Sequence, residues 1–204
     1  VLGSTQTGKT SFVRELHATT PRDVSIWVNE RGDERETGIH GVEARDLEDV
    51  RDAIARRESH IEFLPADRQA AMPGLRSLLW QVSDATDRAL ALQVTIDEAD
   101  RVAPETQSKD VPHRDAVRMF TDEGVKRNIK TITITQHPQG IDKESLRNSR
   151  YRAVWAMSSE AQASVSKYGF DWGEVRDAPM WAGVLHYMTG DVLGTVKAAE
   201  EYAT

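Results

Sequence analysis

Two glycines, a lysine and several hydroxyl side chains lie within the first eleven residues of the chain. The spacing of Gly3, Gly8, Lys9 and Thr10 is G-x-x-x-x-G-K-T. Glycines let the backbone curl until successive N–H groups point at one anion, and a following helix adds its positive end there. In such a loop, Lys9 reaches the β- and γ-phosphates of ATP and the Thr10 hydroxyl binds Mg²⁺. The residues expected to bind the nucleotide are Gly3, Ser4, Thr5, Gln6, Thr7, Gly8, Lys9, Thr10 and Ser11.

Two adjacent carboxylates, Asp97 and Glu98, directly follow the apolar segment LQVTI at residues 92–96. That segment predicts a buried strand, and ligands of open α/β sheets bind at the carboxyl ends of the strands. We expect Asp97 to hold Mg²⁺, directly or through water, and Glu98 to polarise the attacking water. Taken alone, an Asp-Glu pair is as typical of a solvated turn as of a catalytic site. Together with the phosphate-binding loop, the pair favours hydrolysis.

A neutral amide, Gln136, follows a third segment, residues 130–135, which is β-branched at nearly every position. An amide at that edge of a sheet can hydrogen-bond both the γ-phosphate and the lytic water. A glutamine at a strand end is, taken alone, more often a polar cap. With Lys9 and Glu98, we interpret Gln136 as a catalytic residue.

Apolar segments alternate with helical patterns along the chain, as a parallel sheet with crossover helices requires. Strands are expected at residues 24–28, 60–64, 92–96, 130–135 and 152–157, and helices at 11–17, 46–57, 74–91, 114–126 and 158–169. Pro73 is expected at a helix start. Thr189-Gly190-Asp191 predicts the turn of a C-terminal β-hairpin. The fold class is therefore α/β with a mainly parallel sheet.

The length of 204 residues suits a single domain spanning residues 1–204. The chain begins without Met two residues before the loop, so we expect part of the first strand to precede residue 1. No apolar run approaches the roughly 18 residues of a membrane-spanning helix. The absence of cysteine excludes disulfides, and the net charge of −7 means that any polyanion must be bound by local basic loops.

Three motifs in one order carry a resemblance to a known family. They are the phosphate-binding loop, the strand ending in Asp97-Glu98, and the strand ending in Thr135-Gln136-His137-Pro138, followed by LRNSRYRAVWAMSSEAQ. The chain, over residues 1–198, resembles the HerA/FtsK superfamily of DNA-translocating P-loop ATPases. Within it, the chain is similar to the genome-packaging ATPases of tailless icosahedral viruses with internal membranes.

This resemblance implies a RecA-like P-loop NTPase fold of the additional-strand, catalytic-glutamate type. It also implies an ATP-driven double-stranded DNA translocase that packages a viral genome. The partners that follow are double-stranded DNA, further copies of the chain in a homo-oligomeric ring, usually a hexamer, and capsid vertex proteins. The expected location is the host cytoplasm or the virion.

Members of this family supply an arginine to the γ-phosphate of the neighbouring subunit, often from a Gly-Arg pair ahead of the glutamine strand. The matching pair here is Gly124-Val125, which lacks the arginine. We take Arg127, two residues on, as the first candidate, followed by Arg118 and Arg150. Each of them is equally compatible with an ordinary surface arginine.

DNA contact in the family comes from loops that face the ring pore and bind phosphates. The candidates here are residues 31–45, residues 67–74, and the basic cluster Arg147, Arg150 and Arg152, although charged loops are more often solvated surface. The tryptophans at positions 27, 80, 155, 172 and 181 fall mostly in strand or helix patterns, so we assign them to the core.

Three other functions remain open on the sequence. A cellular HerA/FtsK-type translocase in DNA processing or conjugation would use the same motor. A nucleoside or small-molecule kinase would need an acceptor site and would not need Glu98. A nucleotide-regulated scaffold would not hydrolyse ATP at all, and Glu98 argues against that role.

Overall fold

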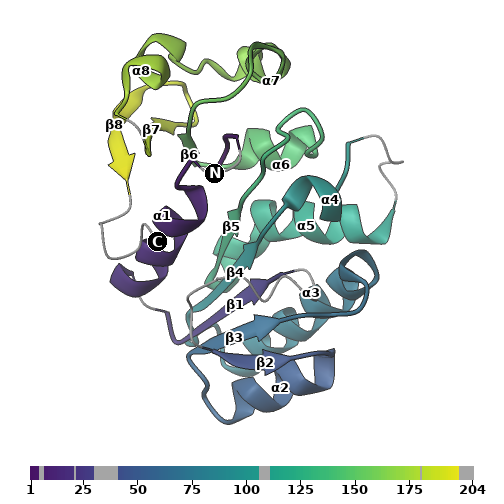
Figure 1. Cartoon of the computed structure of the whole chain (residues 1–204). Helices are drawn as coiled ribbons and strands as arrows, with labels where there is room; N and C mark the ends of the chain where they lie inside the picture. Colours follow the sequence, from purple (N-terminus) through teal and green to yellow (C-terminus); the bar gives the residue numbers. More distant parts are fainter. Residues whose placement is uncertain (5–6, 21, 30–40, 106–110, 180, 198–204) are drawn as a thin grey trace.

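The computed structural model describes residues 1–4, 7–20, 22–29, 41–105, 111–179 and 181–197. A parallel sheet of five strands forms its centre, in the order β2-β3-β1-β4-β5 (Figure 1). The strands are β1 (Val24–Val28), β2 (Val42–Ala44), β3 (His60–Phe63), β4 (Leu92–Ile96) and β5 (Ile129–Thr133). The expected strands at 24–28 and 92–96 are confirmed with the same bounds. All five residues of β1 and of β4 are buried, which explains their near-continuous apolar sequences.

Leu2 connects this sheet to a second, smaller one. It forms parallel bridges with Thr135, just beyond β5, and with Val154 at the end of β6 (Tyr151–Val154). Strand β5 thus lies between the phosphate-loop segment and β4, which is the additional-strand arrangement that the resemblance implies. The second sheet has the order β6-β7-β8 and is antiparallel throughout.

The C-terminal hairpin joins β7 (Ala182–Tyr187) to β8 (Val192–Lys197). Gly190 in its turn has φ 99°, in the left-handed region that glycine adopts without strain. The predicted hairpin is confirmed.

Helices cover both faces of the central sheet (Figure 1). Helix α1 (Lys9–Thr19) covers one face, where Val13 packs against Trp27 in a small cluster. Helices α2 (Leu47–Ala55), α3 (Arg68–Ala85) and α5 (Pro112–Glu123) cover the other face over the main core. The remaining helices are α4 (Ala99–Val102), η1 (Gly124–Arg127), α6 (Lys143–Asn148), α7 (Ser159–Val165), η2 (Ser166–Tyr168) and α8 (Trp172–Asp177).

The start of α3 corrects one prediction. Pro73 lies inside the helix, whereas we expected it to begin there. The helix begins at Arg68 because the Asp67 side chain caps it, accepting the N–H of Ala70 at 3.0 Å. Pro73 lacks a backbone N–H donor, but it follows the first turn that Asp67 caps, so the helix continues through it. Residues 67–74, which we expected to be a loop, are therefore the cap and first turns of a helix.

Other elements also differ from expectation: α3 ends at Ala85 instead of residue 91, and β6 ends at Val154 instead of residue 157. Strand β2 lies within the charged stretch that we interpreted as a loop, of which residues 30–40 lie outside the described residues. Strand β5 ends at Thr133, and Thr135 pairs with Leu2 instead of with β4. Within the described ranges, no helix is both long and apolar enough to cross a membrane.

Candidate active site

Both glycines of the phosphate-binding loop, between Leu2 and α1, have positive φ. Gly8 caps α1 with φ 88°, a left-handed conformation. The Thr7 hydroxyl donates to the Ser4 carbonyl at 2.8 Å, and the Lys9 ammonium donates to that same carbonyl. Lys9 Nζ also lies 3.4 Å from Thr7 Oγ1, so the lysine folds back over its own loop. Thr5 and Gln6 lie outside the described residues, and Thr10 and Ser11 lie in the first turn of α1.

Trp155, which follows β6, packs against this loop. A Cβ on Gly3 would lie 2.6 Å from Trp155 Cβ, and one on Gly183 would lie 2.6 Å from its ring. The indole Nε1 donates to the Trp181 carbonyl at 3.3 Å, and the Phe12 ring of α1 packs 5.3 Å away between centroids. Trp155 is buried, as expected, but no sequence signal linked it to the loop. Trp181 is 53% exposed, so its assignment to the core was wrong.

Lys9 and Asp97 form the electrostatic centre of the site. Burial lowers the pKa of Lys9 to about 8, and the nearby Asp97 carboxylate partly opposes that shift. Burial also raises the pKa of Asp97, while the Glu98 N–H, 2.9 Å from Asp97 Oδ1, acts to lower it. The hydroxyl of Thr10 and the carboxylate of Asp97 are hard oxygen ligands of the kind that Mg²⁺ binds together with phosphate oxygens and water.

Glu98 directly follows Asp97 and caps the short helix α4. Its backbone is left-handed, with φ 45° and ψ 50°. Its Oε2 lies 3.0 Å from Nη1 of Arg101 and 3.6 Å from Nη2 of Arg68. Neither arginine belongs to a recognised motif, so the sequence did not predict their pairing with Glu98.

Gln136 lies where the loop segment, β5 and the turn after β4 meet. The Thr135 N–H donates to the Val1 carbonyl at 3.0 Å, and the Ala99 N–H donates to the Ile134 carbonyl at 2.9 Å. The side chain of Gln136 is partly buried. The structure thus brings the phosphate loop, the acidic pair and the amide to one edge of the sheet.

The first candidate arginine, Arg127, lies away from this edge. Arg127 in η1 precedes β5, at the amino edge of the sheet, where its Nη1 lies 2.5 Å from Asp84 Oδ1 and its guanidinium 5.2 Å from the Trp80 ring centre. Arg118 pairs with Asp115 and Glu144, each at 2.9 Å. Arg150 is exposed just ahead of β6.

One member of the proposed DNA-binding cluster has a structural role. Arg152 is buried, and its guanidinium donates to the carbonyls of Leu146, Arg147 and Met188 at 2.9–3.1 Å. It cannot reach DNA from there, so its inclusion in that cluster was wrong. Arg147 and Arg150 are exposed.

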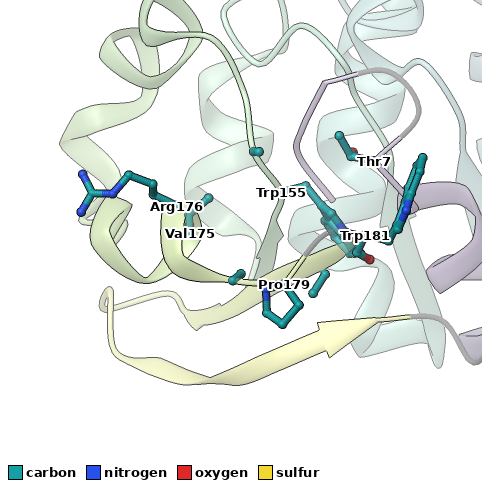
Figure 2. Close-up of a pocket in the computed structure, with 9 residues that line it drawn as sticks. Thr7, Trp155, Val175, Arg176, Pro179 and Trp181 are labelled. Carbon is teal, nitrogen blue, oxygen red and sulfur yellow. Dashed lines mark hydrogen bonds between the residues drawn. The ribbon is translucent and has the colours of Figure 1, made fainter.

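A cavity of about 320 Å³ adjoins the phosphate loop (Figure 2). Trp155 and Trp181 line it beside Thr7, and Arg176 and Pro179 line it farther from that residue (Figure 2). The remaining lining residues are Ala156, Val175, Ala178 and Ala182. Its mostly apolar walls suit a flat organic ring. The cavity was not expected from the sequence, because its lining residues come from three separate segments.

Known protein families and curated proteins give no match to this chain. Solved structures do. The genome packaging NTPase B204 of Sulfolobus turreted icosahedral virus 2, in complex with AMPPCP, is 13% identical with a TM-score of 0.73, over 98% of this chain and 96% of that one. Its complex with ATP-gammaS gives 14% identity and a TM-score of 0.69, over 97% and 95%.

Bacterial ATPases match less closely. EssC from Geobacillus thermodenitrificans is 11% identical with a TM-score of 0.62, over 98% of this chain and 39% of that one. The type VII secretion ATPase EccC of Thermomonospora curvata is 15% identical with a TM-score of 0.58, over 97% and 25%. The chain therefore has the fold of the P-loop ATPases, and its resemblance to the HerA/FtsK superfamily is confirmed at the level of that fold.

Proposed function

We propose that this chain hydrolyses ATP at the carboxyl edge of its central sheet. The observation that carries the proposal is the meeting of the phosphate loop, Asp97-Glu98 and Gln136 at that edge, with β5 between the loop and β4. This is the set of groups that phosphoryl transfer to water requires: a phosphate cradle, a metal ligand, a base and a polar group near the γ-phosphate.

Each residue has a distinct task in this proposal. Lys9 neutralises the β- and γ-phosphates, while Thr10 and Asp97 would hold Mg²⁺, whose charge stabilises the negative phosphate oxygens. Glu98 accepts a proton from water as the water oxygen bonds to the γ-phosphorus and ADP leaves with the electron pair. Gln136 hydrogen-bonds the γ-phosphate and that water. The nucleoside end of ATP occupies the cavity beside Thr7.

We further propose that hydrolysis drives double-stranded DNA into a viral capsid. The support is the similarity to B204, described as a genome packaging NTPase, which has the higher TM-scores among the structures compared. The proposed partners are double-stranded DNA, a homo-oligomeric ring and capsid vertex proteins, in the host cytoplasm or the virion. A cellular translocase is the second candidate, favoured by the EssC and EccC matches.

A ring would bring an arginine of one subunit to the γ-phosphate of the next, and Arg127 is our first candidate. To act there, it must leave Asp84 and the Trp80 ring. Arg127→Ala is expected to abolish turnover and leave nucleotide binding intact. Unchanged turnover would remove Arg127 and bring Arg118 and Arg150 forward.

The deciding experiment measures phosphate release from Mg²⁺-ATP, with and without linear double-stranded DNA. Release without any acceptor excludes a kinase and a non-hydrolysing scaffold, and stimulation by DNA supports a translocase. Glu98→Gln should lower kcat by about 10²–10⁴-fold, the usual contribution of a general base. If Glu98→Gln retains full activity, the assignment of the base is wrong.

A further inference from the structure

A cluster of buried polar side chains joins helix α1 to strand β4. His17, in the last turn of α1, is 3% exposed, and its Nε2 lies 2.7 Å from Thr95 Oγ1. The same nitrogen lies 2.7 Å from Nε2 of Gln93. Both of these β4 side chains are fully buried. In this His17 cluster (His17, Gln93 and Thr95), one imidazole contacts two positions of the strand that leads to Asp97.

The composition of the His17 cluster does not maximise stability. Polar groups lose water when they are buried, and apolar side chains of similar volume would fill the same space without that cost. Among the described residues, moreover, His17 Nδ1 and Gln93 Oε1 have no hydrogen-bond partner. What the three mutually bonded side chains provide is a fixed distance and orientation between α1 and β4.

The ring of His17 is also held by a third element. Its centroid lies 5.2 Å from that of the Trp27 ring in β1, and the two ring planes are tilted by 40°. Trp27 is itself buried and packs with Val13 of α1. A side chain that is fixed by packing as well as by hydrogen bonds holds its partners in one geometry, so movement of α1 at His17 is transmitted to β4.

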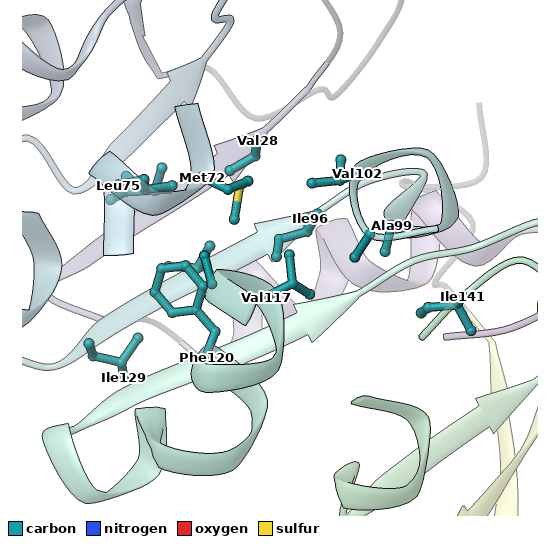
Figure 3. Packing of buried hydrophobic residues seen from close by; sticks show 14 of the residues in the cluster. Val28, Met72, Leu75, Ile96, Ala99, Val102, Val117, Phe120, Ile129 and Ile141 are labelled. Carbon is teal, nitrogen blue, oxygen red and sulfur yellow. The ribbon is translucent and has the colours of Figure 1, made fainter. Parts of the chain in front are cut away.

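Alternation along β4 places the His17 cluster and the proposed metal ligand on one face of the sheet. Ile96 faces the main core with Val117 (Figure 3). Side chains of a strand alternate between its two faces, so Thr95 and Asp97 both face α1. Burial lowers the pKa of Lys9, and the Asp97 carboxylate lies close enough to oppose part of that shift, in agreement with this placement.

Helix α1 carries the other half of the proposed site. It begins at Lys9, with Thr10 in its first turn, and His17 follows Thr10 by about two turns of helix. Because β5 lies between the phosphate-loop segment and β4, these two segments share no strand pairing in the part of the chain that the structure describes. The contact of His17 with β4 is a direct link between them that bypasses β5.

We propose that His17 is a positioning residue that fixes the Thr10 hydroxyl relative to the Asp97 carboxylate. Because both oxygens are assigned to Mg²⁺, a fixed separation lets the metal and the nucleotide strengthen each other's binding. Without the His17 cluster, the phosphate loop still binds nucleotide, but its alignment with Asp97 is lost. This inference rests on the proposed function, in which Thr10 and Asp97 hold the metal.

The test measures a metal-linkage factor, defined as the Kd of ATP-gammaS in EDTA divided by its Kd in saturating Mg²⁺. Titration calorimetry of the full chain gives both constants. His17→Leu removes both hydrogen bonds and should lower the factor about five- to tenfold, at or below the lower end of the effect of residues that orient metal ligands. The Kd in EDTA should change less than twofold. His17→Gln, whose amide can take the place of Nε2, should restore most of the factor.

Thr95→Val is the second variant and carries the test if His17→Leu does not fold. Valine has the shape of threonine without the hydroxyl, and it should lower the factor less than His17→Leu does, since Gln93 still contacts His17. Thr131→Val is the matched control on the neighbouring strand β5. It removes a hydroxyl that donates to the Phe120 carbonyl of α5 at 3.0 Å, on the other face of the sheet, and should leave the factor unchanged.

Asp97→Asn separates this inference from the proposed function. It weakens the metal ligand itself, so it should lower the factor more than His17→Leu. If Asp97→Asn leaves the factor unchanged, the metal assignment of the proposed function is wrong and the role of His17 falls with it.

If Asp97→Asn lowers the factor while His17→Leu and Thr95→Val leave it unchanged, the proposed function stands and the positioning role of His17 is refuted. An equal loss in Thr131→Val would also refute that role, because general loosening of the sheet would then explain the effect.

Discussion

Gly183→Ala tests whether Trp155 couples the second sheet to the phosphate loop. Gly183 lies in β7, where a Cβ would approach three ring atoms of Trp155 to 2.6–2.7 Å, whereas ordinary contacts begin at about 3.5 Å. The ring therefore has to shift by nearly 1 Å. A Cβ on Gly3 would meet Trp155 Cβ and Cα, and the indole Nε1 is bonded to the Trp181 carbonyl, so a shift of Trp155 is passed to the loop.

Overpacking of this kind costs about 1–3 kcal/mol of unfolding free energy. For a chain of this size that corresponds to a melting temperature lower by about 2–12 °C. Because the displaced ring supports the loop, we also expect Gly183→Ala to weaken ATP-gammaS binding. Urea unfolding and titration calorimetry measure the two effects separately.

A double-mutant cycle with Trp155→Phe isolates the contact. Phenylalanine lacks the bulk of the indole, so Gly183→Ala should cost less in that background than in the unaltered chain. The reasoning is refuted if Gly183→Ala leaves both stability and binding unchanged, or if its cost is the same with Phe at position 155.

Three other predictions concern titration and nucleotide binding. The pKa of Lys9 is about 8 without bound phosphate, so ATP affinity should fall as pH rises through 8. Binding of ATP at pH 8 should therefore take up protons, which calorimetry in two buffers of different ionisation enthalpy measures. Lys9→Met should abolish this proton uptake. The pKa of His17 is lowered to about 4 by burial, then by His60 and Lys130, so the unfolded chain binds more protons between pH 4 and 6.5. Unfolding free energy should therefore fall as pH drops through that window, and by a smaller amount in His17→Gln. Trp181→Ala removes a cavity wall and should raise KM for ATP with kcat unchanged, whereas an unchanged KM would place the nucleoside elsewhere.

The sequence by itself determined the central strands, several helix ends and the three motifs. Strands β1 and β4 are buried at every position, so their local apolar sequences suffice to define them. Ser158 caps α7 through its side chain, and Gly169 ends η2 in the left-handed region, both as their residue types predict. Motif spacing predicted the phosphate loop because backbone geometry there depends on adjacent residues.

Only the tertiary structure decided which distant groups meet. The pairing of Glu98 with Arg68, the position of Trp155 under Gly3 and the cavity at Trp181 each join segments far apart in the chain. Such contacts depend on strand order and on which face a side chain occupies. The local patterns that identify a strand or a helix carry no record of either.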